Sequence, residues 1–396
     1  MNGKAPSRWR IDWVAFPGAL IGLTAVVLPW LTLRPNRLAA GESIGILEAL
    51  GPVAAVFAVL WLLCLTLARG SSREWRLGLL GLLGSLLLPA TLTAAGLAAS
   101  RLLTVAPSTA RASLGPGVWL GLLASYVVVH ATRTRLRHRR ALRAIVTWSG
   151  PLLVLLAGLL GAFGDLSLAR EFAGNEARFL NEAARHVALA ATSVCIGALV
   201  AIPLGVLAYR NRRIERPVFA ITSAFETIPS LALFGLLMAP LSALSHAYPA
   251  LRELGIRGVG AAPALIALVI YSLLPIVHNT YAGLRQVNPA AIEAARGMGM
   301  SRRQVAWRVE FPLAAPLIGQ GVRTASVQAV GNTTGAALIG AGGLGHFIFQ
   351  GLGQAAPDLI LLGAVPVIGL AVAVDLGLGG LVRLLTAKGL RGEEGP

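Results

Sequence analysis

The chain has 396 residues, of which 56% are hydrophobic and only 13% charged, whereas a typical soluble domain carries about 25% charged residues. The apolar residues come in blocks of about 20, long enough to cross the hydrocarbon of a bilayer as helices, and strict alternation is absent, which excludes a transmembrane β-barrel. The formal net charge of +17 does not indicate a nucleic-acid partner, because the basic residues gather in alternate loops between the apolar blocks. We therefore expect an all-α, polytopic transmembrane protein of about ten spans.

Five of these spans belong to an N-terminal extension over residues 1–165. They are predicted at 14–33, 45–68, 77–100, 117–132 and 144–164, and none contains a motif that we recognise. A basic run from Arg133 to Arg143 separates the last two. Three roles stay open for this extension: widening a dimer, binding regulatory lipid through the basic run, or packing alone.

The second half begins with an amphipathic stretch of mixed charge at 166–183, which we expect to form an external linker. Five more spans are predicted at 184–209, 218–241, 259–284, 313–338 and 359–385, within a transport domain at 184–387. Several prolines lie in or beside these spans, where they bend helices and release backbone carbonyls. Such bends are compatible with a transport path, although proline is also common in membrane helices generally. Residues 388–396 are expected to form a tail.

The distribution of Lys and Arg predicts the orientation of the chain. Basic residues are enriched before the first span, after each even-numbered span and at the C-terminus, and short cytoplasmic loops carry such an excess. The enriched segments are 1–13, 69–76, 133–143, 210–216, 285–308 and 383–391. Both termini are therefore expected on the cytoplasmic side of the cell membrane. Separately, the sequence predicts no catalytic and no metal-ligating cluster.

The predicted cytoplasmic loop at 285–312 has an organised sequence. Pro289 suits the first position of a short helix, where its missing N–H costs nothing. Gly297 and Gly299 allow the chain to turn, and Ser301 suits the N-cap of a second short helix. Pro312 then marks the entry to the next span. The loop is therefore predicted as a helix pair, although an ordinary amphipathic connector would share some of these features.

This loop resembles the EAA loop of ABC importer permeases, in which Glu-Ala-Ala is followed by Gly after three residues and by Pro further on. The matching positions here are Glu293, Ala294, Ala295, Gly299 and Pro312. Val309 and Phe311 stand where the family has Ile and Leu, and both remain apolar. The resemblance implies a type I ABC importer permease core in the C-terminal half, with the loop seated in a groove of a separate ATPase subunit.

The same resemblance implies the partners. They are an ABC ATPase subunit, a substrate-binding protein, and a second copy of the permease or a paralogue, all in a lipid membrane. The sequence has no G-x-x-x-x-G-K-[ST] motif, so no cofactor is expected in this chain, and ATP with Mg²⁺ is expected on the partner subunit. The chain is thus expected to be a transport subunit and not an enzyme.

A second resemblance concerns the substrate. The blocks 224–233 and 331–345 are similar to those of permeases for glycine betaine, carnitine and choline, and the overall resemblance covers residues 180–387. An N-terminal extension of several spans is also found in the low-affinity glycine betaine subgroup. Two alternatives stay open: a permease for another small solute of the amino-acid, taurine or nitrate type, and an ion-coupled secondary transporter.

Polar residues within the second half are candidates for a translocation path, since ionisable groups in spans are expensive and often functional. They are Glu226, Tyr271, Gln328, Asn332 and Thr333. Glu226 could meet a quaternary ammonium group or pair with Arg323, and for Asp375 we expect a hydrogen bond between helices. The segment 340–345 satisfies G-x-G-x-x-G, but it follows a span instead of a strand, so we predict a bend there and not a nucleotide site.

Overall fold

The computed structural model describes residues 12–37, 39–69 and 74–385, so the predicted tail at 388–396 lies outside the described residues. The chain divides into two compact units. The first comprises Met1–Gly174 with Gln354–Asp358, and the second comprises Asn175–Gly353 with Leu359–Pro396.

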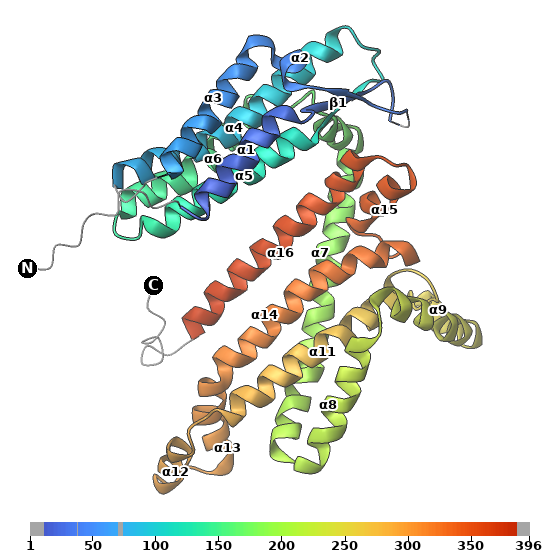
Figure 1. The fold of residues 1–396 in the computed structure, drawn as a ribbon. Helices are drawn as coiled ribbons and strands as arrows, with labels where there is room; N and C mark the ends of the chain where they lie inside the picture. Colours follow the sequence, from blue (N-terminus) through green and yellow to red (C-terminus); the bar gives the residue numbers. More distant parts are fainter. Residues whose placement is uncertain (1–11, 38, 70–73, 386–396) are drawn as a thin grey trace, which may run out of the picture. The chain divides into compact units, whose positions relative to one another are not determined.

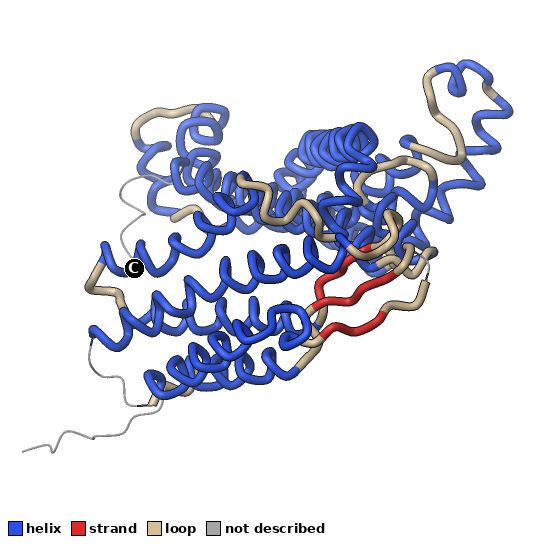
Figure 2. The backbone as a smooth tube through the Cα atoms, turned by 90° about the horizontal axis from the view of Figure 1, so that it is seen from above, coloured by secondary structure: helices blue, strands red, loops and turns tan. Residues whose placement is uncertain are grey.

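The first unit combines helices with a small sheet (Figures 1 and 2). Its helices are α1 (Ala15–Val27), α2 (Ile46–Leu50), η1 (Gly51–Val53), α3 (Ala54–Ala68), α4 (Glu74–Thr104), α5 (Pro116–Arg135) and α6 (Arg140–Leu159). The antiparallel sheet has the order β2-β1-β3, with strands β1 (Leu31–Arg34), β2 (Glu42–Ile44) and β3 (Arg111–Leu114).

This small sheet within a mostly helical fold was not predicted from the sequence. The predicted first span, 14–33, is helical only to Val27, and its last residues belong to β1. Leu28 is extended, with ψ 157°, because the residue before a proline is disfavoured in the helical region, and Pro29 has no N–H with which to continue the helix.

Tight contacts between helices hold the first unit together. Trp30 and Phe57 meet edge to face with their ring centroids 4.9 Å apart, and the indole N–H of Trp30 donates to the carbonyl of Ala25 at 2.9 Å. Gly22 of α1 lies against the buried ring of Trp61 of α3, where a Cβ would come within 2.1 Å of the ring. Small residues thus let the helices of this unit approach closely.

The second unit is helical. Its elements are α7 (Ser167–Arg210), α8 (Arg212–Thr227), α9 (Ser230–Ala247), α10 (Pro249–Glu253), α11 (Ala261–Arg285), α12 (Pro289–Gly297), α13 (Arg302–Val305), η2 (Ala306–Glu310), α14 (Phe311–Ala336), η3 (Ala337–Ile339), α15 (Gly345–Gly353) and α16 (Pro357–Leu385). Asn175 interrupts α7 with a non-helical φ of −130°, and the division between the two units falls at this point. The predicted linker, 166–183, is therefore helical on both sides of a break.

Glycines bring three helices of the second unit together, and Figure 1 shows α11 and α14 running alongside one another. A Cβ on Gly197 of α7 would lie 1.8 Å from the hydroxyl of Ser272 of α11, and one on Gly205 would lie 2.7 Å from Thr280. On α14, a Cβ on Gly321 would lie 2.8 Å from the carbonyl of Pro275. These three helices pack backbone to backbone, in the manner of small-residue interfaces in membranes.

Seven helices in the described ranges are long and apolar enough to span a membrane, and α1 is a shorter apolar helix. The polytopic helical architecture is thereby confirmed, while the figure of ten spans stays a prediction. One predicted span, 218–241, is not a continuous helix: α8 ends at Thr227 and α9 begins at Ser230. Ile228 is extended, with ψ 126°, again because a proline follows, and Pro229, the N-cap of α9, is extended as well, with ψ 137°.

Candidate functional site

The loop between α11 and α14 folds as the predicted helix pair. The side chain of Asn288 accepts from the N–H of Ala290 at 2.9 Å and caps α12. Gly299 ends the turn with φ +81°, a conformation that favours glycine, whereas Gly297 is still helical. Ser301 and Gln304 form a capping box at the start of α13, with the side chain of Gln304 accepting from the Ser301 N–H at 2.8 Å.

The helix α12 has one face toward the protein and one away from it. Ala295 is only 1% exposed, whereas Glu293, Ala294 and Met298 are exposed. Within the described residues the Glu293 carboxylate has no hydrogen bond or ion pair. The two alanines of the matched motif therefore differ in role: Ala295 seats the helix, and Ala294 leaves a flat outer surface beside a free carboxylate.

The inner face of α12 reaches the cytoplasmic ends predicted for three spans. Leu284 at the end of α11 and Val287 just after it form a buried cluster with Ala314 of α14, and Tyr209 of α7 and Ile292 of α12 pack against it. Ile292 therefore connects α12 to the ends of α7, α11 and α14 through one apolar cluster.

An ion pair at the same place was missed by the sequence reasoning. Arg210 at the end of α7 lies 3.3 Å from the carboxylate of Glu310, which is 9% exposed. Glu310 is the last residue of η2, a π-helical turn that joins α13 to α14, and such turns often occur at functional sites. The available signal was an acidic residue two positions before Pro312.

The break between α8 and α9 is secured by Tyr271. Its hydroxyl donates to the carbonyl of Ile228 at 2.6 Å, which satisfies a backbone group released by the break. Tyr271 is 8% exposed and belongs to a buried apolar cluster with Phe234. Glu226 lies two residues before Ile228 and is exposed at the end of α8.

The other predicted path residues lie on α14 and differ in exposure. Thr333 is fully buried and its hydroxyl donates to the carbonyl of Ala329 at 2.7 Å, so its polar group is already satisfied. Asn332 is half-buried and Gln328 is exposed. In the described part of the chain no hydrogen bond links Glu226, Tyr271 or these three residues to one another. The structure therefore does not assemble them into one preformed pocket.

The glycine-rich segment after η3 is a bend, and no strand precedes it. Its left-handed residues are Gly340, Gly342 and Gly343, with φ of 78°, 82° and 97°. The Gly343 N–H donates to the carboxylate of Glu182 at 2.6 Å. One turn along α7, Nδ1 of His186 accepts from the Leu344 N–H at 3.3 Å.

The second ring nitrogen of His186 lies 2.9 Å from the carbonyl of Val330 on α14. Because Nδ1 accepts, Nε2 carries the proton and donates to this carbonyl, so the imidazole is neutral. Glu182 and His186 are 8% and 0% exposed, and together they fasten the bend to α7. Sequence reasoning missed both, although their spacing of four residues places them on one helix face.

Arg323 pairs with Asp375 and not with Glu226, which corrects one of the alternatives raised for that carboxylate. Both guanidinium–carboxylate distances between α14 and α16 are 2.7 Å. Gly379, one turn beyond Asp375, leaves room for the guanidinium, since a Cβ there would lie 3.1 Å from Cζ of Arg323. The expected link between helices at Asp375 is confirmed, and it has the bidentate geometry typical of Arg–carboxylate pairs.

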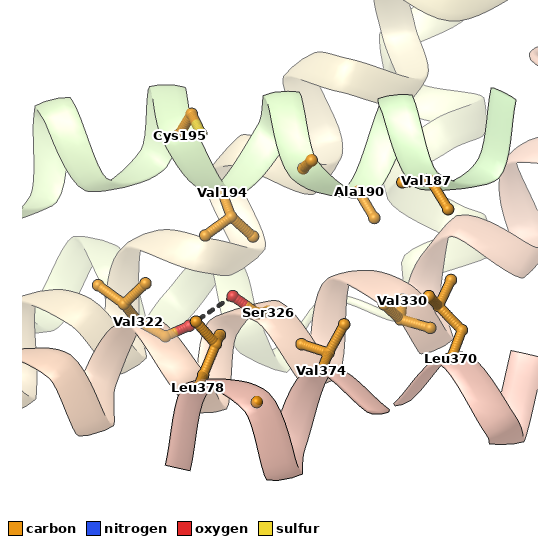
Figure 3. Close-up of a pocket in the computed structure, with 12 residues that line it drawn as sticks. Val187, Ala190, Val194, Cys195, Val322, Ser326, Val330, Leu370, Val374 and Leu378 are labelled. Carbon is orange, nitrogen blue, oxygen red and sulfur yellow. Dashed lines mark hydrogen bonds between the residues drawn. The ribbon is translucent and has the colours of Figure 1, made fainter. Parts of the chain in front are cut away.

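A pocket of about 460 Å³ lies between α7, α14 and α16 (Figure 3). Figure 3 shows the Ser326 hydroxyl turned to the carbonyl of Val322, at 2.8 Å, which leaves an apolar lining. The lining residues are Val187, Ala190, Ala191, Val194, Cys195, Val322, Ser326, Val330, Leu370, Val374, Gly377 and Leu378. Such a lining offers a cation neither a carboxylate nor an aromatic face, so the pocket is suited to hydrocarbon.

Two family models match different parts of the chain. Residues 193–388 match the binding-protein-dependent transport system inner membrane component. Residues 11–169 match the N-terminal domain of the ABC transporter permease YehY. The first match confirms a permease core in the C-terminal half of a multi-pass inner-membrane protein.

Curated relatives match the same half. The carnitine transport permease protein OpuCB of Listeria monocytogenes is 40% identical over 56% of this chain and 94% of its own length. The choline transport system permease protein OpuBB of Bacillus subtilis is 38% identical over 55% of this chain and 93% of its own length. The osmoprotectant import permease protein OsmW of Salmonella typhimurium is 39% identical, with coverages of 52% and 91%.

Among solved structures, a chain of the MetNI methionine ABC transporter in an inward-facing conformation is 23% identical, with a TM-score of 0.46 over 53% of this chain and 96% of that one. The assignment rests on the sequence relatives, because they exceed a third identity over nearly their whole length. The chain therefore belongs to the osmoprotectant branch of the binding-protein-dependent ABC permeases, with a YehY-type N-terminal domain preceding the permease core.

Proposed function

We propose that this chain forms the translocation path of an ATP-driven importer for glycine betaine, carnitine, choline or a related quaternary amine. The names of the relatives support this substrate class. The basic loops support an orientation with both termini in the cytoplasm, which places α12 and α13 on the ATP side of the membrane.

The observation that carries the proposal is the two-faced helix α12. Its outer face presents Glu293, Ala294 and Met298 to a partner, while on its inner face Ala295 is buried and Ile292 packs on the ends of the spans. A separate ABC ATPase docks on the outer face, binds ATP with Mg²⁺, and moves α12 when it closes. A second copy of the chain completes the path, a binding protein delivers the substrate from outside, and membrane lipid surrounds the spans.

The broken helix α8–α9 is the proposed lining of the path. Its break leaves Glu226 exposed, and a carboxylate in a low-dielectric setting attracts a quaternary ammonium group. Gln328 and Asn332, the exposed and half-buried polar residues of α14, are proposed to line the same path. Tyr271 is proposed to support the path without lining it, since its hydroxyl holds the carbonyl of Ile228 at the break.

The test is reconstitution of the full chain with its ATPase and binding protein in proteoliposomes, followed by uptake of radiolabelled glycine betaine, carnitine and choline. We expect uptake that requires ATP and is lost in Glu293→Lys. The matched control is Glu253→Lys, since Glu253 is exposed on α10, outside the coupling loop. Uptake without the ATPase, driven by an ion gradient, would establish the secondary-transporter alternative. Uptake of an amino acid, taurine or nitrate in place of the amines would refute the substrate.

A further inference from the structure

The basic run between α5 and α6 contains two kinds of arginine. Arg135 lies 3.1 Å from the buried carboxylate of Asp12, and Arg139 lies 2.9 Å from Glu74. These two pairs join the run to the starts of α1 and α4, so both arginines have a structural role. Their charges are neutralised within the first unit.

Four other arginines of the run have no acidic partner among the described residues, and one of them is the exposed Arg137. The other three are Arg133 in the last turn of α5 and Arg140 and Arg143 in the first turn of α6, and all three are exposed. These same three residues line a hollow of about 410 Å³, together with Ala144, Thr147 and Trp148. Three of the four unpaired arginines therefore surround one cavity, and Arg137 lies outside its lining.

The start of α6 adds to the attraction for an anion. No side chain caps this helix at Arg139, so its first backbone N–H groups are free of a side-chain acceptor. Residues 140, 143–144 and 147–148 follow one another at helical spacing, so they share a face. The combination of guanidinium groups and a helix N-terminus suits a phosphate group.

Apolar side chains continue from the hollow along α6. Trp148 is 61% exposed, and Leu152, Leu155 and Leu159 follow on the same side with 59%, 61% and 77% exposure. A tryptophan at the head of an apolar helix is typical of the level of lipid headgroups. The site thus combines a hollow lined by arginines, suited to a phosphate group, with an exposed apolar face of α6 that continues directly from it.

We propose that the hollow between α5 and α6 is a binding site for an anionic phospholipid, with the phosphate held by Arg133, Arg140 and Arg143 and an acyl chain lying along the leucines of α6. A free phosphate would use the hollow and leave the leucines uncovered. A zwitterionic lipid would use the leucines but would bring its own cation to the arginines. Only an anionic lipid uses both parts.

The test is native mass spectrometry of the purified full chain in detergent, titrated with phosphatidylglycerol, with phosphatidylcholine of the same acyl chains, or with glycerol 3-phosphate. We expect one tightly held phosphatidylglycerol, and binding weakened about tenfold or more when Arg133, Arg140 and Arg143 are all changed to Gln. The matched control changes Arg212, Arg213 and Arg216 of α8 to Gln, which removes equal charge from exposed positions elsewhere. This control keeps the bound lipid.

A second measurement places the lipid and covers the case in which the triple variant does not fold. Phosphatidylglycerol brominated on its acyl chains quenches nearby tryptophan, so part of the quenching disappears in Trp148→Phe. Equal loss of binding in the α8 control, equal affinity for phosphatidylcholine, saturation by glycerol 3-phosphate, or quenching unchanged in Trp148→Phe would each overturn the proposal.

Discussion

Replacing Gly343 by alanine tests the fastening of the glycine-rich bend to α7. The residue has φ +97°, and a side chain in this region costs about 1–3 kcal/mol. The new Cβ would lie 3.2 Å from Nδ1 of His186, so the ring must shift away from its two backbone partners. Weakening those two hydrogen bonds adds roughly 1 kcal/mol for each, which gives a total loss of about 3–5 kcal/mol.

The assay is thermal unfolding of the purified chain in detergent, alongside uptake in proteoliposomes. We expect the melting temperature to fall by roughly 5 °C or more and uptake to fall with it. Gly331→Ala is the matched control, because Gly331 is helical in α14 and its Cβ would meet open space. Its melting temperature should hold or rise, since alanine is the better helix former. Equal stability of the two variants would refute the reasoning.

Three further predictions follow from single contacts. Tyr271→Phe removes the donor to the carbonyl at the α8–α9 break and should lower the free energy of unfolding by about 1 kcal/mol. It should also reduce uptake, and unchanged uptake would contradict the proposal that Tyr271 fixes the break beside the path. Arg210→Gln and Glu310→Gln should each reduce the ATPase stimulation by substrate, and the double variant should do little more than either alone; additive losses would contradict the pairing. The hydrogen bond from Arg170 lowers the pKa of the Asp165 carboxyl in the folded chain. This hydrogen bond therefore contributes to the free energy of unfolding above the ordinary carboxyl pKa of about 3.9, and the contribution is lost as the pH falls through the lowered pKa of the folded chain. The melting temperature of Asp165→Asn should lack this decrease at acidic pH.

The residue pattern was sufficient to predict the helical membrane architecture and the coupling loop. Hydropathy identifies apolar blocks because a span must be continuous and uncharged. Pro289, Gly299 and Ser301 are read locally, since helix starts, caps and left-handed turns depend on neighbouring residues only. The local signals therefore predicted α12 and α13 and named two glycines for the turn, of which Gly299 makes it and Gly297 stays helical.

Contacts between residues far apart in the chain could not be predicted from the sequence pattern. Glu182 meets Gly343 across 161 positions, and no local pattern indicates which carboxylate reaches which bend. The partner of Arg323 was open for the same reason, because Glu226 and Asp375 both stand in apolar blocks. The break after Thr227 was concealed by hydropathy, which is indifferent to whether an apolar segment is helical or extended.

The π-helical turn at Ala306–Glu310 has a consequence for how the coupling loop can be re-engineered. A π turn holds about one residue more than an α turn, and one residue corresponds to roughly 100° of rotation about a helix axis. The loop and α14 are thus joined with an angular offset that a regular helix would not give. Deleting Trp307, which is 65% exposed, would turn the loop about the axis of α14 and point Glu293 away from its present direction without altering either helix. The number of residues in this turn therefore sets the direction in which the docking face of α12 points.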